Sequence, residues 1–400
     1  MSLNHLMASL SFCLDFVSQG LDRHHQRVTF TSLVLAEALG LTNADKAAVF
    51  TAGIVHDAGV SSWREKSTLK QFDVDTPWDH CQRGFDLLRG TSLLAPVAEI
   101  VLCHHDRWAA DNRSGKSGRD IPLAARIIHL ADRVDVLLEP SIYVLYQREN
   151  ILAAIARLAG RVFDPDLVSL LTEVSSRESF WLDLTSPFLL RRLSEYPLPS
   201  LAPTNSQVLL DLSNLFAGII DAKSPFTHRH SRGVAQAAET LAADMGFSVE
   251  EQARVRVAGL LHDLGKLSVP DEILEKPGPL TPAEFAVIRQ HTYYTYHILR
   301  EAGSPDPIPA WAAYHHEKLN GSGYPFHLDA SQLSPGARLM AVADTFTALR
   351  EDRPYRPGMP RPQIEKIMEE QVESGAFDPT VVDVLLANYR HLEELWATLQ

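Results

Sequence analysis

The chain carries the same order of histidines and aspartates twice. The first copy holds a lone histidine, a His-Asp pair, a second lone histidine, a His-His pair and an aspartate: His24, His56, Asp57, His80, His104, His105 and Asp132. The second copy repeats each residue type at an offset that drifts slowly from 206 to 212 residues: His230, His262, Asp263, His291, His315, His316 and Asp344. The tripeptide Phe-Asp-Pro at 163–165 also recurs at 377–379. Recurrence of this kind indicates a duplicated domain.

Most of the sequence around these residues has helical periodicity. Apolar residues recur at three- and four-residue spacing in VTFTSLVLAEALGL, VRVAGLLHDLGK and ARLMAVADTFTALR, and the alternation typical of strands is scarce. Gly40 and Gly246 follow apolar helical runs, as C-terminal caps do, and Asp45 and Ser248 lie near the starts of the next helices. We therefore expect an all-α protein made of two tandem helical bundles.

A proline-rich stretch separates the two copies. Pro197, Pro199 and Pro203 stand close together and disfavour a long helix. The length of 400 residues also exceeds one ordinary hydrophobic core. We expect an N-terminal domain over 1–196, a linker over 197–205 and a C-terminal domain over 206–400.

Composition narrows the class of protein. The net charge of −13 argues against binding of long nucleic acid, although a metal ion could still supply local positive charge for a small phosphorylated substrate. The three cysteines, Cys13, Cys81 and Cys103, form no CxxC pair, so we expect reduced thiols and a cytoplasmic location. The N-terminus lacks a basic leader, and no window approaches eighteen apolar residues, so we expect neither a secretory signal nor a membrane span.

The second copy predicts a metal centre. Imidazole nitrogens and carboxylate oxygens are ligands of divalent transition metals, and the absence of cysteine disfavours a structural zinc site. His262 and Asp263 follow the apolar run VAGLL, and Asp344 lies inside LMAVADTFTAL, so each acid is expected beside a buried helical face. A single such residue would more often be an ordinary core histidine or a paired aspartate, but seven at matched positions favour a shared site. Seven ligands exceed the need of one ion, and Asp263 can bridge two, which is typical of hydrolysis at phosphorus.

Three segments of the second copy resemble the signatures of the HD-GYP phosphodiesterases: HDLGK at 262–266, HHEKLNGSGYP at 315–325 and DTFTALREDRPYR at 344–356. The resemblance runs from about residue 224 to 379. It implies two tandem HD-superfamily bundles and a bacterial cyclic dinucleotide as the substrate. It also implies two divalent ions, with iron or manganese favoured and magnesium, nickel or zinc as alternatives.

The same resemblance assigns roles to individual residues. One ion is held by His230, His262, Asp263 and Asp344. The other is held by Asp263, His291, His315 and His316. Asp263 and Lys266 are the predicted catalytic residues, and the substrate is expected to contact Lys266, Gly323, Tyr324, Arg353 and Arg356. Independently, Gly321 and Gly323 would let a loop backbone approach a ligand, and two arginines near a metal-bearing helix suit a diphosphate.

The second copy departs from the family pattern in two places. Some members carry a glutamate four residues before the first ligand histidine and hold a third metal, but Phe226 stands there, so two metals are expected. His228, close by, is interpreted as a surface histidine. Asn320 stands where an aspartate is common, and we expect no change in chemistry from it.

The first copy keeps all seven ligand types and is a candidate second metal site: His24, His56, Asp57, His80, His104, His105 and Asp132. It has lost other groups, because Val60 stands at the place of Lys266 and Ser141 at the place of Arg353. We expect it to be catalytically degenerate and to pack against or regulate the other half. Cys81 and Cys103 adjoin ligand histidines, and we assign them no role.

Several functional hypotheses stay open at this point. Cyclic di-GMP is favoured because it is the usual family substrate, whereas the order of domains is similar to known 3′3′-cyclic GMP-AMP phosphodiesterases. A non-catalytic dinucleotide receptor and a general HD nucleotide phosphohydrolase are disfavoured by Lys266 and by the GYP and RPYR segments. A homodimer is also considered, without a residue that argues for it.

Overall fold

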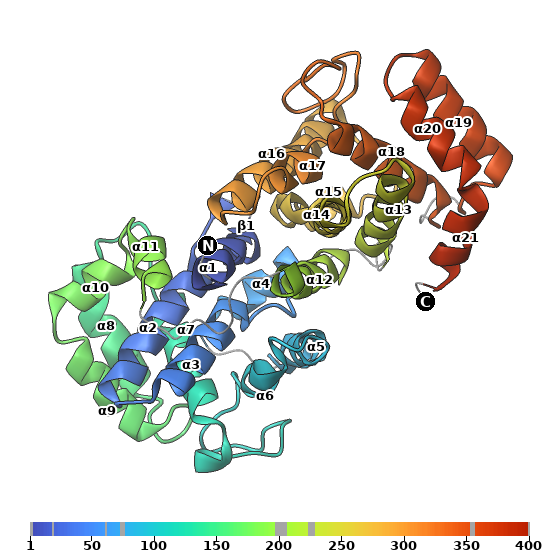
Figure 1. The fold of residues 1–400 in the computed structure, drawn as a ribbon. Coiled ribbons are helices and arrows are strands. Elements are labelled where there is room, and N and C mark those ends of the chain that lie inside the picture. The colour runs from blue at the N-terminus through green and yellow to red at the C-terminus, as the bar shows by residue number, and fades with distance from the viewer. Residues whose placement is uncertain are drawn as a thin grey trace. The chain divides into compact units, whose positions relative to one another are not determined.

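The chain folds into two compact units, Met1–Asn205 and Ser206–Gln400 (Figure 1). The computed structural model describes residues 3–17, 20–60, 62–72, 77–196, 206–222, 229–352 and 357–398. The expected linker at 197–205 lies outside these ranges. Within them, no helix has both the length and the apolar character that crossing a bilayer requires.

In the first unit, short and medium helices surround a central pair formed by α2 and α3. Its elements are α1 (Leu3–Leu14), β1 (Phe16–Val17), β2 (Gly20–Leu21), α2 (His24–Ala38), α3 (Asn43–Val55), α4 (Trp63–Leu69), α5 (Trp78–Arg89), η1 (Ala95–Val97), α6 (Ala98–Leu102), η2 (Gly118–Asp120), α7 (Leu123–Val136), α8 (Val144–Ala156), α9 (Pro165–Val174), α10 (Glu178–Leu184) and α11 (Leu189–Ser194). The strands β1 and β2 form a two-residue antiparallel pair, the one sheet among the described residues.

The second unit repeats this plan. Its elements are α12 (Ser206–Ala222), α13 (His230–Asp244), α14 (Val249–Leu261), η3 (Leu264–Ser268), α15 (Asp271–Leu274), α16 (Pro282–Glu301), α17 (Ile308–Ala313), α18 (Pro335–Arg350), α19 (Arg361–Glu373), α20 (Pro379–Ala387) and α21 (Tyr389–Thr398).

Equivalent helices pack in the same way in both units. In the first, α2 packs against α3 and α7, and α5 packs against α6. In the second, α13 packs against α14 and α18, and α16 packs against α17 (Figure 1). These helices carry the matching histidines and aspartates. The predicted all-α fold with a duplicated bundle is therefore confirmed.

The cores lie between these central helices. Leu35, Ile54 and Ile128 are fully buried in the first unit, as are Leu241 and Val342 in the second. Apolar residues at helical spacing therefore hold each bundle together by burying one face of every central helix.

The predicted helix ends are mostly where the sequence indicated. Gly40 and Gly246 follow α2 and α13 with φ of 65° and 80°, the left-handed conformation that favours glycine after a helix. Ser248 caps α14 in a reciprocal capping box with Glu251. At α3 the cap is Thr42, whose hydroxyl accepts from the backbone N–H of Asp45. Asp45 instead lies in the first turn, where a carboxylate favours the helix dipole.

Candidate metal centre

Five helices of the second unit bring all seven predicted ligands together. His230 is the first residue of α13, and His262 and Asp263 directly follow α14. His291 lies in the middle of α16, and Asp344 lies in α18. His315 and His316 come two and three residues after the end of α17. The chain thus places most ligands at helix ends, where the backbone direction changes.

The turn after α14 is fixed by contact with α16. Gly265 packs so closely on α16 that a Cβ atom would lie 1.9 Å from the carbonyl oxygen of His291. The hydroxyl of Thr295 accepts from the backbone N–H of Gly265 at 2.9 Å and donates to the carbonyl of His262 at 3.1 Å. These contacts hold the His-Asp pair against the third ligand histidine, which explains why glycine is needed here.

Asp263 stands between two groups of imidazoles. Its Oδ2 atom lies 3.2 Å from His262 Nε2 and 3.7 Å from His230 Nε2. Its Oδ1 atom lies 3.5 Å from His291 Nε2 and 3.9 Å from His315 Nε2. Each carboxylate oxygen therefore faces a different group, as a bridging ligand requires.

Asp344 completes the cluster from α18. Its Oδ1 atom lies 3.2 Å from His230 Nε2, and its Oδ2 atom lies 3.9 Å from His316 Nδ1. Two ligand atoms that each lie ~2.1 Å from one ion are between roughly 3.0 and 4.2 Å apart, depending on the angle at the ion. The spacing of the donors therefore fits divalent ions. His230, His262 and Asp344 offer ligand atoms within 4.8 Å of one another, and so do His291, His315 and His316, which is the grouping that the resemblance implies. His316 also lies near Asp344.

Two buried atoms of the cluster support this fit. His262 Nε2 and Asp263 Oδ1 have no hydrogen-bond partner in the described part of the chain. Buried polar atoms are normally satisfied, so an orphaned imidazole nitrogen beside an orphaned carboxylate oxygen calls for a cation. The donor set contains only nitrogen and oxygen, which suits iron or manganese as well as zinc.

Hydrogen bonds on the far side of each ring orient the ligand nitrogens. The Nδ1 atoms of His262, His291 and His315 donate to backbone carbonyls at 2.7–2.8 Å. His230 Nδ1 donates instead to Glu351 Oε2 at 3.0 Å. Each Nε2 lone pair is thereby directed into the cluster, as in many metal sites. Sequence reasoning missed Glu351, although its spacing of seven residues from Asp344 would place it on the same helical face.

Shifted pKa values keep several of these side chains in the protonation state that binds a cation. Burial lowers the pKa of His291 to about 3 and that of His316 to about 4, so both rings are neutral near pH 7. Burial alone would raise the pKa of Asp263, but His262 and Lys266 outweigh it and hold that pKa well below its usual range. His230 differs because, against burial, Asp344 and Glu351 raise its pKa to about 10. A metal ion must displace a proton there.

Lys266 lies in the cluster as the sequence predicted. Its Nζ atom donates to Asp263 Oδ2 at 2.5 Å, and its side chain is 22 % exposed. The ammonium therefore lies between the predicted bridging carboxylate and the solvent side of the site, where an incoming phosphate could reach it.

The loop of the GYP segment packs beside His316. The Tyr324 ring centroid lies 4.9 Å from that of His316. Glu317, which is buried, accepts from the backbone N–H groups of Phe326 and Leu328 at 2.7 and 3.0 Å and so anchors the loop. A Cβ atom on Gly323 would lie 2.4 Å from Glu317 Cα. The close approach that this glycine allows is therefore to the protein's own backbone.

Four predicted positions lie outside the described residues. They are Arg353 and Arg356 of the RPYR segment, and Phe226 and His228 before the first ligand. Their roles stay predictions.

The first unit gathers its seven ligand-type residues in a similar cluster. Asp57 Oδ1 lies 3.3 Å from His80 Nε2 and 3.5 Å from His104 Nε2, and it has no hydrogen-bond partner among the described residues. His24 Nε2 lies 3.4 Å from Asp132 Oδ1, and its Nδ1 atom donates to Asp135 Oδ2 at 2.7 Å. Asp135 thus takes the part that Glu351 plays in the second unit.

Two basic side chains close this first cluster. Arg133 binds Asp132 Oδ2 through Nη2 at 2.6 Å and Nε at 3.0 Å. Lys66, which is buried, comes from α4 and donates to the carbonyl of Leu14. With Asp57 they line a cavity of about 20 Å³, which is room for about one water molecule. The side chain of His105 is 4 % exposed, whereas that of its counterpart His316 is 31 % exposed.

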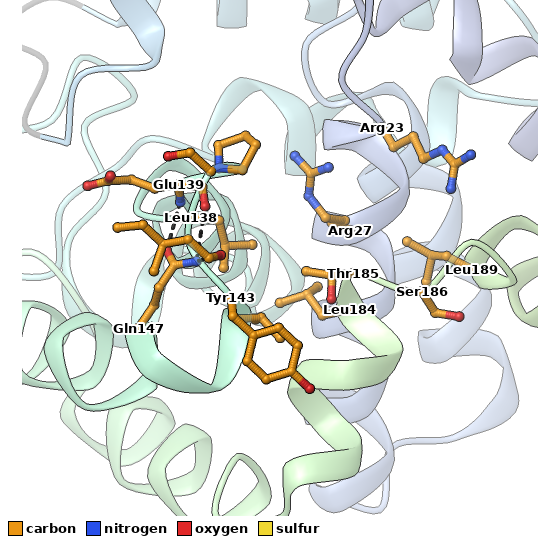
Figure 2. A pocket seen from close by; sticks show the side chains of 14 residues that line it. Arg23, Arg27, Leu138, Glu139, Tyr143, Gln147, Leu184, Thr185, Ser186 and Leu189 are labelled. Atoms are coloured by element: carbon orange, nitrogen blue, oxygen red, sulfur yellow. Dashed lines mark hydrogen bonds between the residues drawn. The ribbon is translucent and has the colours of Figure 1, made fainter.

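A larger pocket of about 540 Å³ lies elsewhere in the first unit (Figure 2). Arg23, directly before α2, and Arg27 of α2 line it, together with the segment after α7 and the end of α10. Ser141, the counterpart of Arg353, belongs to its wall. Arg27 also binds Asp135, through Nη2 at 3.1 Å, so this pocket is separated from His24 by one pair of side chains.

Comparisons with known proteins agree with this geometry. A family model described as "HD domain" matches residues 10–167 and 214–381. The chain is 33% identical to the 3′3′-cGAMP-specific phosphodiesterase 1 of Vibrio cholerae, over 98% of this chain and 93% of that protein. It is 35% identical to a cyclic di-GMP phosphodiesterase of Thermotoga maritima, over 47% of this chain and 50% of that one. Among solved structures, the cyclic GMP-AMP specific phosphodiesterase V-cGAP3 of Vibrio cholerae superposes with a TM-score of 0.68 and 28% identity, covering 97% of this chain and 98% of that one.

Proposed function

The chain belongs to the HD domain family, and from that premise we propose that it hydrolyses a cyclic dinucleotide to a linear dinucleotide with a 5′-phosphate, using the cluster of its second unit. The observation that carries the proposal is the position of Asp263, whose two oxygens face two groups of imidazoles. Relatives that match this chain are phosphodiesterases of such substrates.

The residues of the cluster have different roles in the proposed reaction. Two divalent ions, when bound, supply an activated nucleophile and withdraw charge from the phosphate oxygens. Asp263 and Asp344, together with the oriented histidines, would hold these ions. Lys266 stabilises negative charge that develops on the phosphate, together with Arg353 and Arg356. Tyr324, beside His316, and Gly323, in the same loop, border the substrate. We propose iron or manganese as the metal, with magnesium, nickel or zinc as alternatives.

We propose 3′3′-cyclic GMP-AMP as the preferred substrate. The relatives that align with almost the whole chain, both units included, act on this molecule by name, whereas the cyclic di-GMP relative aligns with half of it. Cyclic di-GMP, which family frequency favoured, is the second candidate. The test is a side-by-side comparison of kcat/KM for both substrates with Mn²⁺ or anaerobic Fe²⁺. A higher kcat/KM for cyclic di-GMP would reverse this choice.

The cluster of the first unit does not catalyse in this proposal. Val60 replaces the lysine, and Arg133 and Lys66 reduce the space to about one water molecule, so a dinucleotide phosphate cannot enter. Arg133 also neutralises Asp132, a carboxylate that a metal would otherwise balance. In the second unit Thr345 follows Asp344, so no arginine stands in the place of Arg133. We therefore propose a second metal site of lower affinity.

Metal content tests this assignment apart from activity. Asp263→Ala should strip the chain of its tightly held ions during dialysis, and adding Arg133→Leu to that variant should raise the metal retained by the first unit. An Asp263→Ala protein that keeps its metal as firmly as the wild type would contradict the proposal.

The three cysteines are free and buried, which fits a reducing compartment. We propose that the protein is cytoplasmic.

A further inference from the structure

The outer face of α16 carries a stripe of residues that the metal cluster does not use. Phe285, Arg289 and Tyr293 are spaced four residues apart, so they lie on one face of the helix. Phe285 is 37 % exposed and Tyr293 is 46 % exposed, both large for aromatic residues in this chain. His291, two residues from Arg289, points from another face into the cluster. The stripe therefore borders the catalytic site without being part of it.

The guanidinium of Arg289 lies against aromatic rings and forms no ion pair with a carboxylate of the described residues. Its guanidinium carbon lies 4.7 Å from the centroid of Phe285 and 5.3 Å from that of Tyr324. The two rings are 5.9 Å apart at an interplanar angle of 80°. Stacking of this kind fixes the plane of a guanidinium while leaving its N–H groups free at the edge.

The pairing of Arg289 differs from that of similar arginines. The other arginines that stack on rings within the described ranges each also form an ion pair with a carboxylate: Arg89 with Asp86, Arg126 with Asp164, Arg192 with Asp183, Arg350 with Glu393 and Arg361 with Glu365. Arg289 has no carboxylate within ion-pair distance in the described part of the chain. An unpaired arginine in a protein with a net charge of −13 offers its donors to a ligand.

Tyr324 connects this arginine to the metal cluster. Tyr324 contacts both groups: its ring centroid lies 5.3 Å from the guanidinium carbon of Arg289 and 4.9 Å from the ring centroid of His316. The phosphates of a bound dinucleotide would lie at the metal cluster and Lys266. Arg289 lies beyond Tyr324 as seen from the metal cluster. It would therefore meet the part of the substrate beyond the phosphate and sugar, which is the nucleobase.

We infer that Arg289 binds a guanine base of the cyclic dinucleotide, with Phe285 and Tyr324 holding its guanidinium in plane and offering their rings to the base. This inference rests on the proposed function and identifies a residue that selects the substrate. The planar fork of arginine matches the O6 and N7 acceptors of guanine, whereas adenine presents a donor at N6 in the place of O6. Exposed aromatic rings beside it stack with bases.

The test compares ligands with and without guanine on the full-length, metal-loaded protein. Arg289→Ala should raise KM for 3′3′-cyclic GMP-AMP and cyclic di-GMP roughly 10- to 100-fold, which is the range for one bidentate guanine contact. Because the contact is remote from the reacting phosphorus, kcat should change by less than about threefold. The inhibition constant of cyclic di-AMP should stay unchanged. Arg289→Lys should behave like Arg289→Ala, since an ammonium keeps the charge but loses the fork.

Arg300→Ala is the matched control, because Arg300 lies on the same helix but pairs with Asp306. It should leave all constants at wild-type values. An equal loss of affinity for the three dinucleotides in Arg289→Ala would indicate a phosphate contact and overturn the inference, and so would unchanged KM values. A wild-type protein that hydrolyses neither guanine dinucleotide would instead overturn the proposed function itself.

Discussion

Replacing Glu351 by glutamine tests whether a residue outside the ligand set controls metal binding in the second unit. Glu351 is buried, and its Oε2 atom accepts from His230 Nδ1 at 3.0 Å. An amide oxygen can still accept this bond, so the ring should keep its orientation. The negative charge is lost, however, and with it the electrostatic support that makes the imidazole a better ligand.

The expected size of the effect follows from similar outer contacts. Removing one typically lowers metal affinity ~10- to 100-fold, which is about 1.4–2.7 kcal/mol. The assay is titration of the chelator-treated protein with Mn²⁺ against a competing indicator, and hydrolysis should recover at saturating metal. Asp135→Asn is the matched control, because Asp135 supports His24 in the first unit in the same way. The reasoning would be refuted if Glu351→Gln bound metal like the wild type, or if Asp135→Asn lost as much hydrolysis.

Three further predictions concern charge, packing and pH. Lys266→Met should lower kcat by roughly 10²- to 10³-fold while the metal content, measured by mass spectrometry, stays unchanged. Gly265→Ala should lower the melting temperature and the metal content, because its Cβ atom would meet the carbonyl of His291, whereas Gly278→Ala, with no atom within 4 Å of the added Cβ, should be neutral. Burial raises the pKa of Asp221 to about 6, so the folded chain keeps a proton that the unfolded chain releases above about pH 4. Asp221 should therefore stabilise the metal-free protein less as the pH rises from about 4 to 6, whereas His291 and His316, with lowered pKa values, act in the opposite direction. The stability that Asp221→Asn gains over the wild type should accordingly grow across this range and reach on the order of 1–3 kcal/mol at pH 7 in urea unfolding. A stability difference between Asp221→Asn and the wild type that is the same at pH 4 and pH 7 would contradict this interpretation of Asp221.

The repeated histidines and aspartates were sufficient to predict the duplicated helical fold and the composition of both clusters. Residue type and spacing carry this information, because a lone histidine, a His-Asp pair and a His-His pair can converge only when their helices pack together. The sequence also indicated the caps at Gly40, Gly246 and Ser248, since each depends on local chemistry.

Contacts that depend on tertiary packing could not be predicted in the same way. Lys66 lies outside every motif and reaches the first cluster only because α4 folds over it. Arg133 follows a predicted ligand directly, yet nothing in the sequence shows that its guanidinium binds that ligand's carboxylate. Glu351 and Asp135 occupy different places relative to Asp344 and Asp132, so the repeat gave no hint of their shared role.

The most direct test of the account is hydrolysis of 3′3′-cyclic GMP-AMP and cyclic di-GMP by the metal-loaded chain and by two matched variants. Asp263→Ala removes the bridging carboxylate of the second unit, and Asp57→Ala removes its counterpart in the first. We expect the wild type and Asp57→Ala to release a linear dinucleotide with a 5′-phosphate, and Asp263→Ala to release none. Hydrolysis that survives Asp263→Ala, or a wild-type protein that cleaves neither substrate, would contradict the account.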